Sequence, residues 1–185
     1  VLLRPLPYPD SDRLVRIWET RADWRNSPRP SMRALADRID PQAPEYFDWQ
    51  RSETGFASLG AYVDASFVLR GPEGSEVLRG QEVTSGLFTA LEVNPTIGRV
   101  LDTRDDQADA PPVVILSEEL WRDRYAGSPN ALGTDLTLGG TPHTVIGVMP
   151  AGFQAPDQAM FEALLPGGGP RLWTPLSEEA RLGWK

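Results

Sequence analysis

The sequence predicts an α+β fold, in which a mixed sheet or sheets pack with a few helices. Strand-like and helix-like stretches follow one another along the 185 residues without a strict βαβ rhythm, which argues against a doubly wound sheet. Two pairs of strand-like runs are joined by short glycine-containing turns, as in β-hairpins. A hydrophobic fraction of 40% is that of an ordinary globular chain, long enough for one domain or two small subdomains.

The first third of the chain predicts one strand and one clear helix. Residues 13–19 ("RLVRIWE") alternate charged and apolar side chains, which indicates a strand. Residues 20–42 lack sustained periodicity and predict a loop with a helical turn near 32–38. Pro44 suits the first turn of the next helix, where its missing N–H costs nothing. Tyr46, Phe47 and Gln50 would share one face of that helix.

The central part predicts a hairpin followed by a helix. Residues 61–69 and 75–83 read as strands joined by the turn "GPEG" at 71–74. Thr84 or Ser85 can cap the next helix, which places three apolar side chains on one face and ends at "NPTIGR" (94–99). These three side chains belong to Leu87, Phe88 and Leu91.

The last part predicts a strand, a capped helix and a second hairpin. Residues 113–116 form a short apolar strand, after which Ser117 caps a helix that Gly127 ends in a left-handed conformation. Residues 134–149 read as two strands around a Gly-Gly turn, and a final extended piece is expected at 172–174.

Composition excludes several classes of function. A net charge of −8 argues against a nucleic-acid partner, because phosphate binding depends on clustered Lys and Arg. The absence of cysteine excludes disulfides, thiolate metal sites and cysteine nucleophiles. No run approaches the apolar length of a membrane helix. Since the chain opens without an initiator Met, we expect it to be a segment of a longer protein.

His143, the only histidine, is the one catalytic candidate. Its neighbours on the same strand face are apolar, and no G-x-S-x-G motif accompanies it, so an ordinary strand-end histidine is the favoured interpretation. A stand-alone hydrolase that uses His143 with a distant Asp and Ser remains an alternative. The acidic run 102–109 lacks the spacing of a calcium loop and predicts a solvated loop. The glycine clusters match no phosphate-binding motif, so no cofactor or metal is expected.

Six tryptophans suggest a second alternative, a ligand- or carbohydrate-binding module. Trp18, Trp49 and Trp121 fall in predicted elements, and we expect them in a core. Trp24 lies in the irregular region and is the candidate for an exposed contact.

The order of short motifs resembles one family along nearly the whole chain. It is similar to the ABC-type permeases of the macrolide-exporter (MacB-like) and FtsX-like group. The motifs are "LLRPLPYPDSDRLVRIWE" (2–19), "PEYFDWQ" (44–50), "LRGQEVTSGLFTALEVNPTIGRVL" (78–101), "VVILSEELWRDRYAG" (113–127), "LGTDLTLGGTPHTVIGVMPAGF" (132–153) and "RLWTPL" (171–176).

The resemblance implies a non-enzymatic, extracytoplasmic core domain between the first two helices of a bacterial inner-membrane permease. It implies a porter-like core with an inserted subdomain, whose C-terminal part is missing here. Residues 1–12 would be a membrane-proximal linker after a first transmembrane helix, and 13–185 the core domain. The implied partners are the permease helices, a cytoplasmic ATPase, a second copy in a homodimer and a periplasmic adaptor. The domain would transmit ATP-driven motion to substrate export or to a partner.

The resemblance also marks positions with structural rather than catalytic roles. Pro5, Pro7 and Pro9 would stiffen the linker, although they could equally just end a helix. Gly98 would supply a turn conformation, and Trp121 would anchor its helix on the sheet. The full set is Pro5, Pro7, Tyr8, Pro9, Gly98, Arg99, Trp121, Gly133, Gly147, Met149, Pro150 and Phe153.

The segment "TVIGVMPAGF" (144–153) predicts a structural corner. Apolar side chains alternate to both sides of this strand, so both faces are expected to be buried. Gly147 leaves room for a close neighbour, and Pro150 ends the hydrogen-bond ladder because it has no donor. Phe153 would then fold back on the core.

Overall fold

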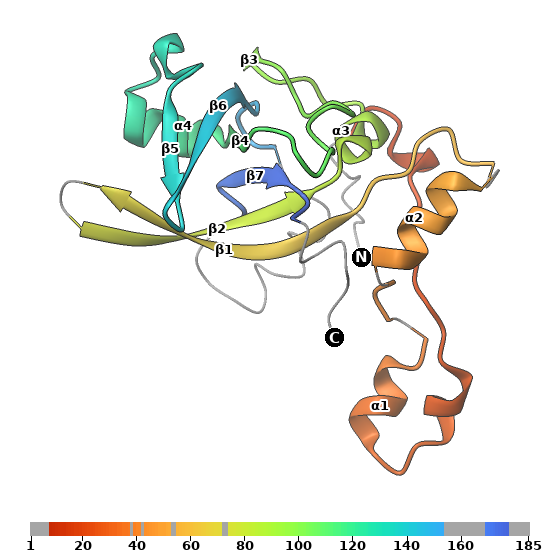
Figure 1. Cartoon of the computed structure of the whole chain (residues 1–185). Coiled ribbons are helices and arrows are strands. Elements are labelled where there is room, and N and C mark those ends of the chain that lie inside the picture. Colours follow the sequence, from red (N-terminus) through yellow and green to blue (C-terminus); the bar gives the residue numbers. More distant parts are fainter. Residues whose placement is uncertain are drawn as a thin grey trace. The chain divides into compact units, whose positions relative to one another are not determined.

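A computed structural model describes residues 8–37, 39–41, 43–52, 55–71, 74–153 and 169–177 (Figure 1). The predicted α+β class with a mixed sheet is confirmed. The elements, with η for a 3-10 helix, are η1 (Ser11–Arg13), η2 (Ala22–Asn26), α1 (Pro30–Leu35), α2 (Ala43–Arg51), β1 (Tyr62–Gly71), β2 (Gly74–Val83), α3 (Ser85–Leu91), β3 (Ile97–Gly98), β4 (Val113–Leu116), α4 (Glu118–Tyr125), η3 (Pro129–Ala131), β5 (Asp135–Leu138), β6 (Thr141–Val148) and β7 (Leu172–Pro175).

The chain divides into two compact units. Among the described residues, unit 1 comprises 8–11, 57–71, 74–153 and 169–177, and unit 2 comprises 12–37, 39–41, 43–52 and 55–56. Along the sequence, unit 2 is thus inserted between two parts of unit 1. All seven strands belong to unit 1.

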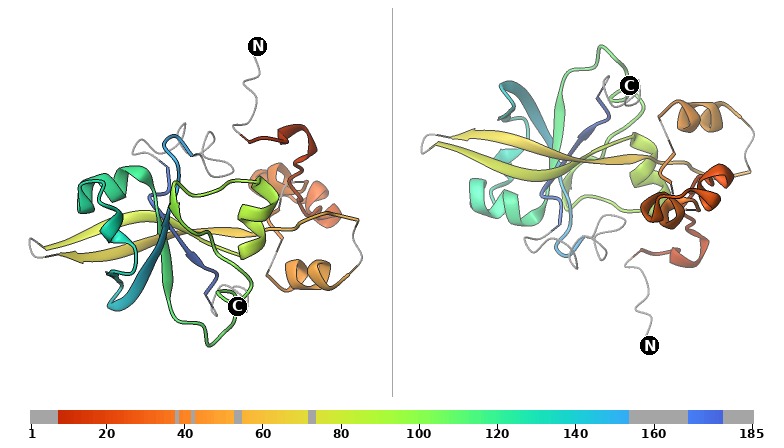
Figure 2. Two further views of the ribbon diagram at one scale, coloured as in Figure 1. Left: turned by 90° about the horizontal axis from the view of Figure 1, so that it is seen from above. Right: turned by 90° about the horizontal axis from the view of Figure 1, so that it is seen from below.

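The two longest strands form the predicted hairpin β1–β2. They pair antiparallel from Tyr62↔Val83 to Gly71↔Gly74, and Figure 2 shows them as a long ribbon that runs past the other strands of unit 1. Side chains alternate as a half-buried hairpin requires. Leu78 is buried toward the core, whereas its neighbour Val77 is 68% exposed on the outer face.

The sheet of unit 1 closes on itself. The strand order is β3-β6-β4-β7-β2-β1-β5, and β5 also pairs with β6, so six strands form a ring. The contact between Leu69 of β1 and Leu138 of β5 completes this ring. The turn Gly139–Gly140 joins β5 to β6, as predicted, with φ values of +58° and +93°. The short strand β3 pairs with the last residues of β6, after the part of β6 that pairs with β5.

β7 is one strand of this ring and lies between β4 and β2. It pairs antiparallel with β4 and parallel with β2, and Trp173 in its centre is 1% exposed. The buried indole N–H donates to Gln81 Oε1 at 3.1 Å, and Gln81 Nε2 donates to Asp64 Oδ1 at 3.0 Å. These bonds satisfy polar groups that would otherwise cost stability inside the core.

A large hydrophobic cluster lies in unit 1, and α4 packs on it. Leu120 of α4 is 1% exposed, while Trp121 and Tyr125 cover the edge of the cluster. Because six strands and one helix contribute to the cluster, its burial stabilises the closed sheet as a whole. The buried members are Leu69, Leu78, Val114, Leu116, Leu120, Leu136, Leu138, Val145, Val148 and Leu172.

The ends of α4 agree with the sequence to within one residue. Ser117 caps the helix as predicted, because its Oγ accepts from Leu120 N–H at 3.1 Å. Gly127 has the predicted left-handed φ of +71°, but Ala126 adopts φ +50° one residue earlier. The helix therefore ends at Tyr125, and two left-handed residues in succession lead into η3.

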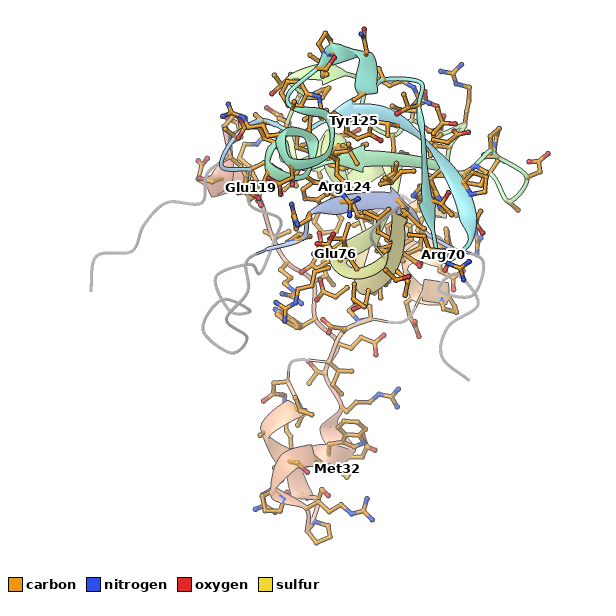
Figure 3. All side chains as sticks on the ribbon, turned by 90° about the vertical axis from the view of Figure 1, so that its left-hand side faces the viewer. Met32, Arg70, Glu76, Glu119, Arg124 and Tyr125 are labelled. Carbon is orange, nitrogen blue, oxygen red and sulfur yellow. The ribbon has the colours of Figure 1, made fainter. Side chains whose placement is uncertain are left out.

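Side-chain ion pairs hold the hairpin against α4. Glu76 of β2 binds Arg124 of α4 at 2.7 Å and Arg171, just before β7, at 3.5 Å (Figure 3). Arg171 also binds Asp123 of α4. These groups are partly exposed, so each pair contributes at most about 1 kcal/mol.

In unit 2 the prediction of a strand at 13–19 is wrong. Only Glu19 pairs, with Ile39, through backbone bonds of 2.8 and 3.2 Å. The alternation at 13–19 finds no partner strand among the described residues, and Val15 is 67% exposed. Trp18 instead lies under the guanidinium of Arg16. The Cζ atom of Arg16 is 3.7 Å from the centre of the Trp18 ring.

The helices of unit 2 follow the predicted ones. α1 begins at Pro30, two residues before the expected turn near 32–38. α2 carries Pro44 in its first turn and buries Tyr46, whose ring packs edge-on against Phe47 at 5.2 Å. No helix within the described ranges is long and apolar enough to cross a membrane.

Candidate functional site

β3 pairs antiparallel with β6, and two glycines let the two backbones lie close together at a point that we call the crossing. Gly98 has φ +78° and pairs with Gly147. A methyl group on Gly98 would lie 2.2 Å from Ile146 O, and one on Gly147 would lie 2.2 Å from Arg99 O. Such contacts are shorter than any carbon–oxygen van der Waals distance, so both positions require glycine. The crossing places Arg99 directly after β3, where its N–H donates to Ile146 O at 2.9 Å.

Arg99 fixes the loop that follows through a two-fold ion pair. Its Nη1 and Nη2 bind the two carboxylate oxygens of Asp105 at 2.5 and 2.9 Å. Asp105 is only 7% exposed and also accepts from Asp102 N–H at 2.8 Å. The hydrogen bond to Asp105 raises the pKa of Arg99 above its usual value. Because both hydrogen bonds of this bidentate ion pair require a defined orientation, the pair fixes the loop relative to the sheet.

The neighbouring Asp106 caps helix α3 from the same loop. Its carboxylate accepts from Ser85 N–H at 3.1 and 3.2 Å and from Ser85 Oγ at 2.6 Å. Thr84 occupies the N-cap position, but its hydroxyl accepts from Ala61 N–H at 2.9 Å instead. A carboxylate at a helix N-terminus is favourable because it meets free N–H groups.

The prediction that 102–109 is a solvated loop is therefore wrong for two of its aspartates. Asp105 and Asp106 turn inward, and Asp102 is bound by Arg104. The side chain of Arg104 donates hydrogen bonds that lower the pKa of Asp102 below its usual range, and its backbone N–H has a smaller effect in the same direction. The loop borders an open hollow of about 550 Å³ lined by Arg99, Arg104 and Gln107, among others. Its two arginines already bind carboxylates, so the hollow offers no unpaired cation to an anionic ligand.

The other motif positions surround the crossing or the core. Gly133 has φ +79°, and its N–H donates to Val145 O at 2.9 Å, beside the crossing. Trp121 Nε1 donates to Ser128 O at 2.8 Å, which locks the indole against the turn after α4. Met149 is fully buried, and its N–H donates to Leu116 O at 2.8 Å.

Pro150 follows Met149 just past the end of β6, and Phe153 returns to the core as expected. The ring of Phe153 packs edge-on against Trp173 at 5.2 Å between centres and lies 6.5 Å from the ring of Phe88. The expected burial of both faces of β6 holds for Val145 and Val148, while Ile146 is half-buried.

Tyr8 connects the N-terminal segment to unit 1. Its side chain is 7% exposed, and burial, with a smaller effect of Tyr62, raises its pKa above the usual value. Pro9, next to it, is exposed. Pro5 and Pro7 lie outside the described residues. The described end of the predicted linker is therefore attached to the unit that contains the closed sheet.

Comparison with known protein families assigns the chain to one of them. Residues 4–183 match the family described as MacB-like periplasmic core domain. The chain belongs to this family. The expected relationship is confirmed, and the protein is an extracytoplasmic domain of a MacB-like ABC transporter permease.

Several solved structures resemble the chain. The extracellular domain of the noncanonic ABC-type transporter YknZ from Gram-positive bacteria has a TM-score of 0.51 and 18% identity, over 71% of this chain and 60% of that domain. The chain thus spans less than two thirds of the YknZ domain, and this likeness shows a shared fold. The periplasmic region of MacB from Actinobacillus actinomycetemcomitans has a TM-score of 0.49 and 17% identity, over 83% of this chain and 73% of that region. A sequence comparison with curated proteins gives no match.

Among the residues that the structure describes, none joins His143 in a catalytic arrangement. His143 lies opposite Leu136 in the β5–β6 hairpin, and its Nδ1 lies 3.0 Å from Thr141 O. Neither a carboxylate nor a serine hydroxyl bonds to it in the described part of the chain. The nearby Asp135 binds Thr144 Oγ1 instead, at 3.0 Å. No group of three or more potential metal ligands is found among the residues that the structure describes.

The tryptophan expectations are only partly met. Trp18, Trp49 and Trp121 are half-buried rather than in a core, and so is Trp24, the candidate for an exposed contact. Of the five tryptophans that the structure describes, Trp173 has the fully buried indole. Sequence reasoning also missed Asp105 and Asp106, because the partner of Asp106 lies 21 residues away and no local pattern signals the contact.

Proposed function

We propose that this domain receives ATP-driven motion of the permease helices through its N-terminal segment and passes it to export of a substrate or to a periplasmic partner. The observation that carries the proposal is the burial of Tyr8 in the unit that holds the closed sheet. A linker can transmit movement only if its far end is attached to a stiff body. Burial of an aromatic side chain supplies such an attachment, and a closed, hydrophobically filled sheet resists deformation.

The sequence of the linker supports the same function. Pro5, Pro7 and Pro9 each fix their backbone angle φ. The segment between a membrane helix and Tyr8 can therefore adopt fewer conformations. We propose that residues 1–12 follow a first transmembrane helix in the bacterial inner membrane. About 20 predominantly apolar residues directly upstream are then expected in the gene product. A polar, charged sequence there would exclude this arrangement.

The proposed partners follow from the family. They are the membrane helices and a cytoplasmic ATPase of the same transporter, a second copy in a homodimer, and a periplasmic adaptor. Copurification of the full-length permease with its ATPase, and its mass in detergent micelles, would test the first and second of these partners.

Hydrogen exchange in the full-length permease tests the role of Tyr8. Peptides covering β1 and β2 should change their protection between the ATP-bound and ADP-bound states in the wild type. In Tyr8→Ala this change should disappear while ATP hydrolysis continues, because the linker has lost its attachment. Tyr8→Phe keeps the ring and serves as the matched control. A Tyr8→Ala protein with the wild-type response would exclude Tyr8 as the attachment.

A further inference from the structure

The segment 20–37 forms a basic lobe in unit 2, which we call the arginine lobe. Its base is closed by the Glu19–Ile39 backbone pair and by Arg21 N–H, which donates to Ala36 O at 2.7 Å. The lobe contains η2 and α1, with Met32 in α1 visible in Figure 3. These contacts hold the lobe as a defined structure rather than a free loop.

The charge of the lobe is opposite to that of the chain. Residues 20–37 contain four arginines and two aspartates, a net charge of +2 (4 − 2), whereas the whole chain carries −8. The four side chains are all exposed and belong to Arg21, Arg25, Arg29 and Arg33.

Most of this positive charge is not neutralised. Arg25 binds Asp37 at 2.6 Å, and Arg33 donates to the backbone oxygen of Ser27 at 2.6 Å, which leaves its charge without a carboxylate. The side chains of Arg21 and Arg29 form no hydrogen bond or ion pair with any residue that the structure describes. The lobe therefore presents guanidinium groups that are available to an anionic partner.

Apolar side chains accompany these arginines. Leu35 at the end of α1 is 52% exposed, and the half-buried Trp24 and Met32 lie in the same lobe. Arginine next to leucine and tryptophan is the composition of segments that lie in a membrane interface, where the cations meet phosphates and the apolar groups enter the headgroup boundary. A purely ionic protein partner would not require the exposed leucine.

We propose that the arginine lobe binds the phosphate headgroups of anionic lipids on the outer leaflet of the membrane in which the permease is embedded. The inference rests on the proposed function, because the lobe begins eight residues after the end of the proposed membrane-proximal linker. The 19 residues before the lobe span at most about 68 Å when fully extended, so the chain length allows the lobe to reach the bilayer surface. The negative charge elsewhere does not prevent contact, since salt screens it beyond about 8 Å.

Vesicle flotation of the 185-residue chain tests the lobe without the transporter. The chain should float with vesicles of phosphatidylcholine and phosphatidylglycerol, and not with phosphatidylcholine alone. Each arginine near an anionic surface strengthens binding roughly fivefold, so Arg21→Gln with Arg29→Gln should weaken it about 30-fold. Leu35→Ser should weaken it about fivefold. Inorganic phosphate at the same phosphate concentration should not compete, because it offers no surface.

The matched control removes two exposed arginines from unit 1, Arg70→Gln with Arg122→Gln. It produces the same net charge and should bind within about twofold of the wild type. Equal flotation with both vesicle types, or equal loss in both double variants, would overturn the proposal. Concentration-dependent self-association that needs Arg21 and Arg29, without flotation, would assign the lobe to a second copy of the chain and also overturn it. Neither outcome affects the nucleotide-dependent exchange expected for Tyr8.

Discussion

At the scale of single residues, Gly98 and Gly147 determine how closely β3 can approach β6. Backbone atoms occupy the space that a side chain would need, and backbone cannot move aside as a flexible side chain can. The crossing in turn sets the position of Arg99 and thereby of Asp105. These glycines therefore matter for the geometry of the loop as well as for packing.

Gly147→Ala should destabilise the domain by about 2–3 kcal/mol, because the new methyl group would force β3 away from β6. Urea denaturation measures this difference. Gly71→Ala is the matched control: Gly71 has no positive φ, and the nearest atom to a methyl group there is the flexible Arg124 Nη1 at 3.2 Å. It should change stability by less than about 0.5 kcal/mol. Equal stability of the two variants would show that the crossing is not tight.

Tyr8 should make stability depend on alkaline pH. Burial raises the pKa of its phenol in the folded state above the value of about 10 in the unfolded state. Its contribution is thus fully present below pH 10 and decreases as pH rises further, because only the unfolded chain then releases the proton. The unfolding free energy of the wild type should fall relative to Tyr8→Phe by up to about 1.4 kcal/mol per pH unit above pH 10. Parallel pH profiles for the two proteins would show that Tyr8 is not buried.

At the scale of elements, α3 depends on a cap that comes from a distant loop. Asp106→Ala should cost about 1–2 kcal/mol, because Ser85 N–H loses its acceptor at the start of the helix. Asp109→Ala is the matched control, since Asp109 is exposed in the same loop and binds no described residue. It should have almost no effect on the melting temperature. A similar loss in both variants would mean that the loop contributes only general charge.

The elements that the sequence predicts well are those whose signals are local. Turn glycines and alternating apolar residues predict both hairpins, and Ser117 predicts the start of α4. The alternation at 13–19 has the same appearance but no partner strand, and pairing over long sequence distances leaves no local pattern. For the same reason the closure through Leu69 and Leu138, the place of β7 between β4 and β2 and the cap from Asp106 could not be predicted.

At the scale of the whole molecule, the two units carry different properties. Unit 1 combines the closed sheet, the glycine crossing and the buried Tyr8, as a body that receives motion requires. The arginine lobe of unit 2 carries a net positive charge within an acidic chain. Most of the motif positions that the structure describes lie around the crossing or the core.

The most direct test follows the domain during ATP turnover. Because the chain has no cysteine, Asp109→Cys provides a single site in it for a fluorescent donor. The full-length permease and its ATPase are reconstituted in nanodiscs that contain an acceptor-labelled lipid, after removal of any other reactive cysteine. Energy transfer from this site to the membrane should change between the ATP-bound and ADP-bound states, because unit 1 moves with the helices. Transfer that stays constant while ATP is hydrolysed would contradict the proposed transmission of motion.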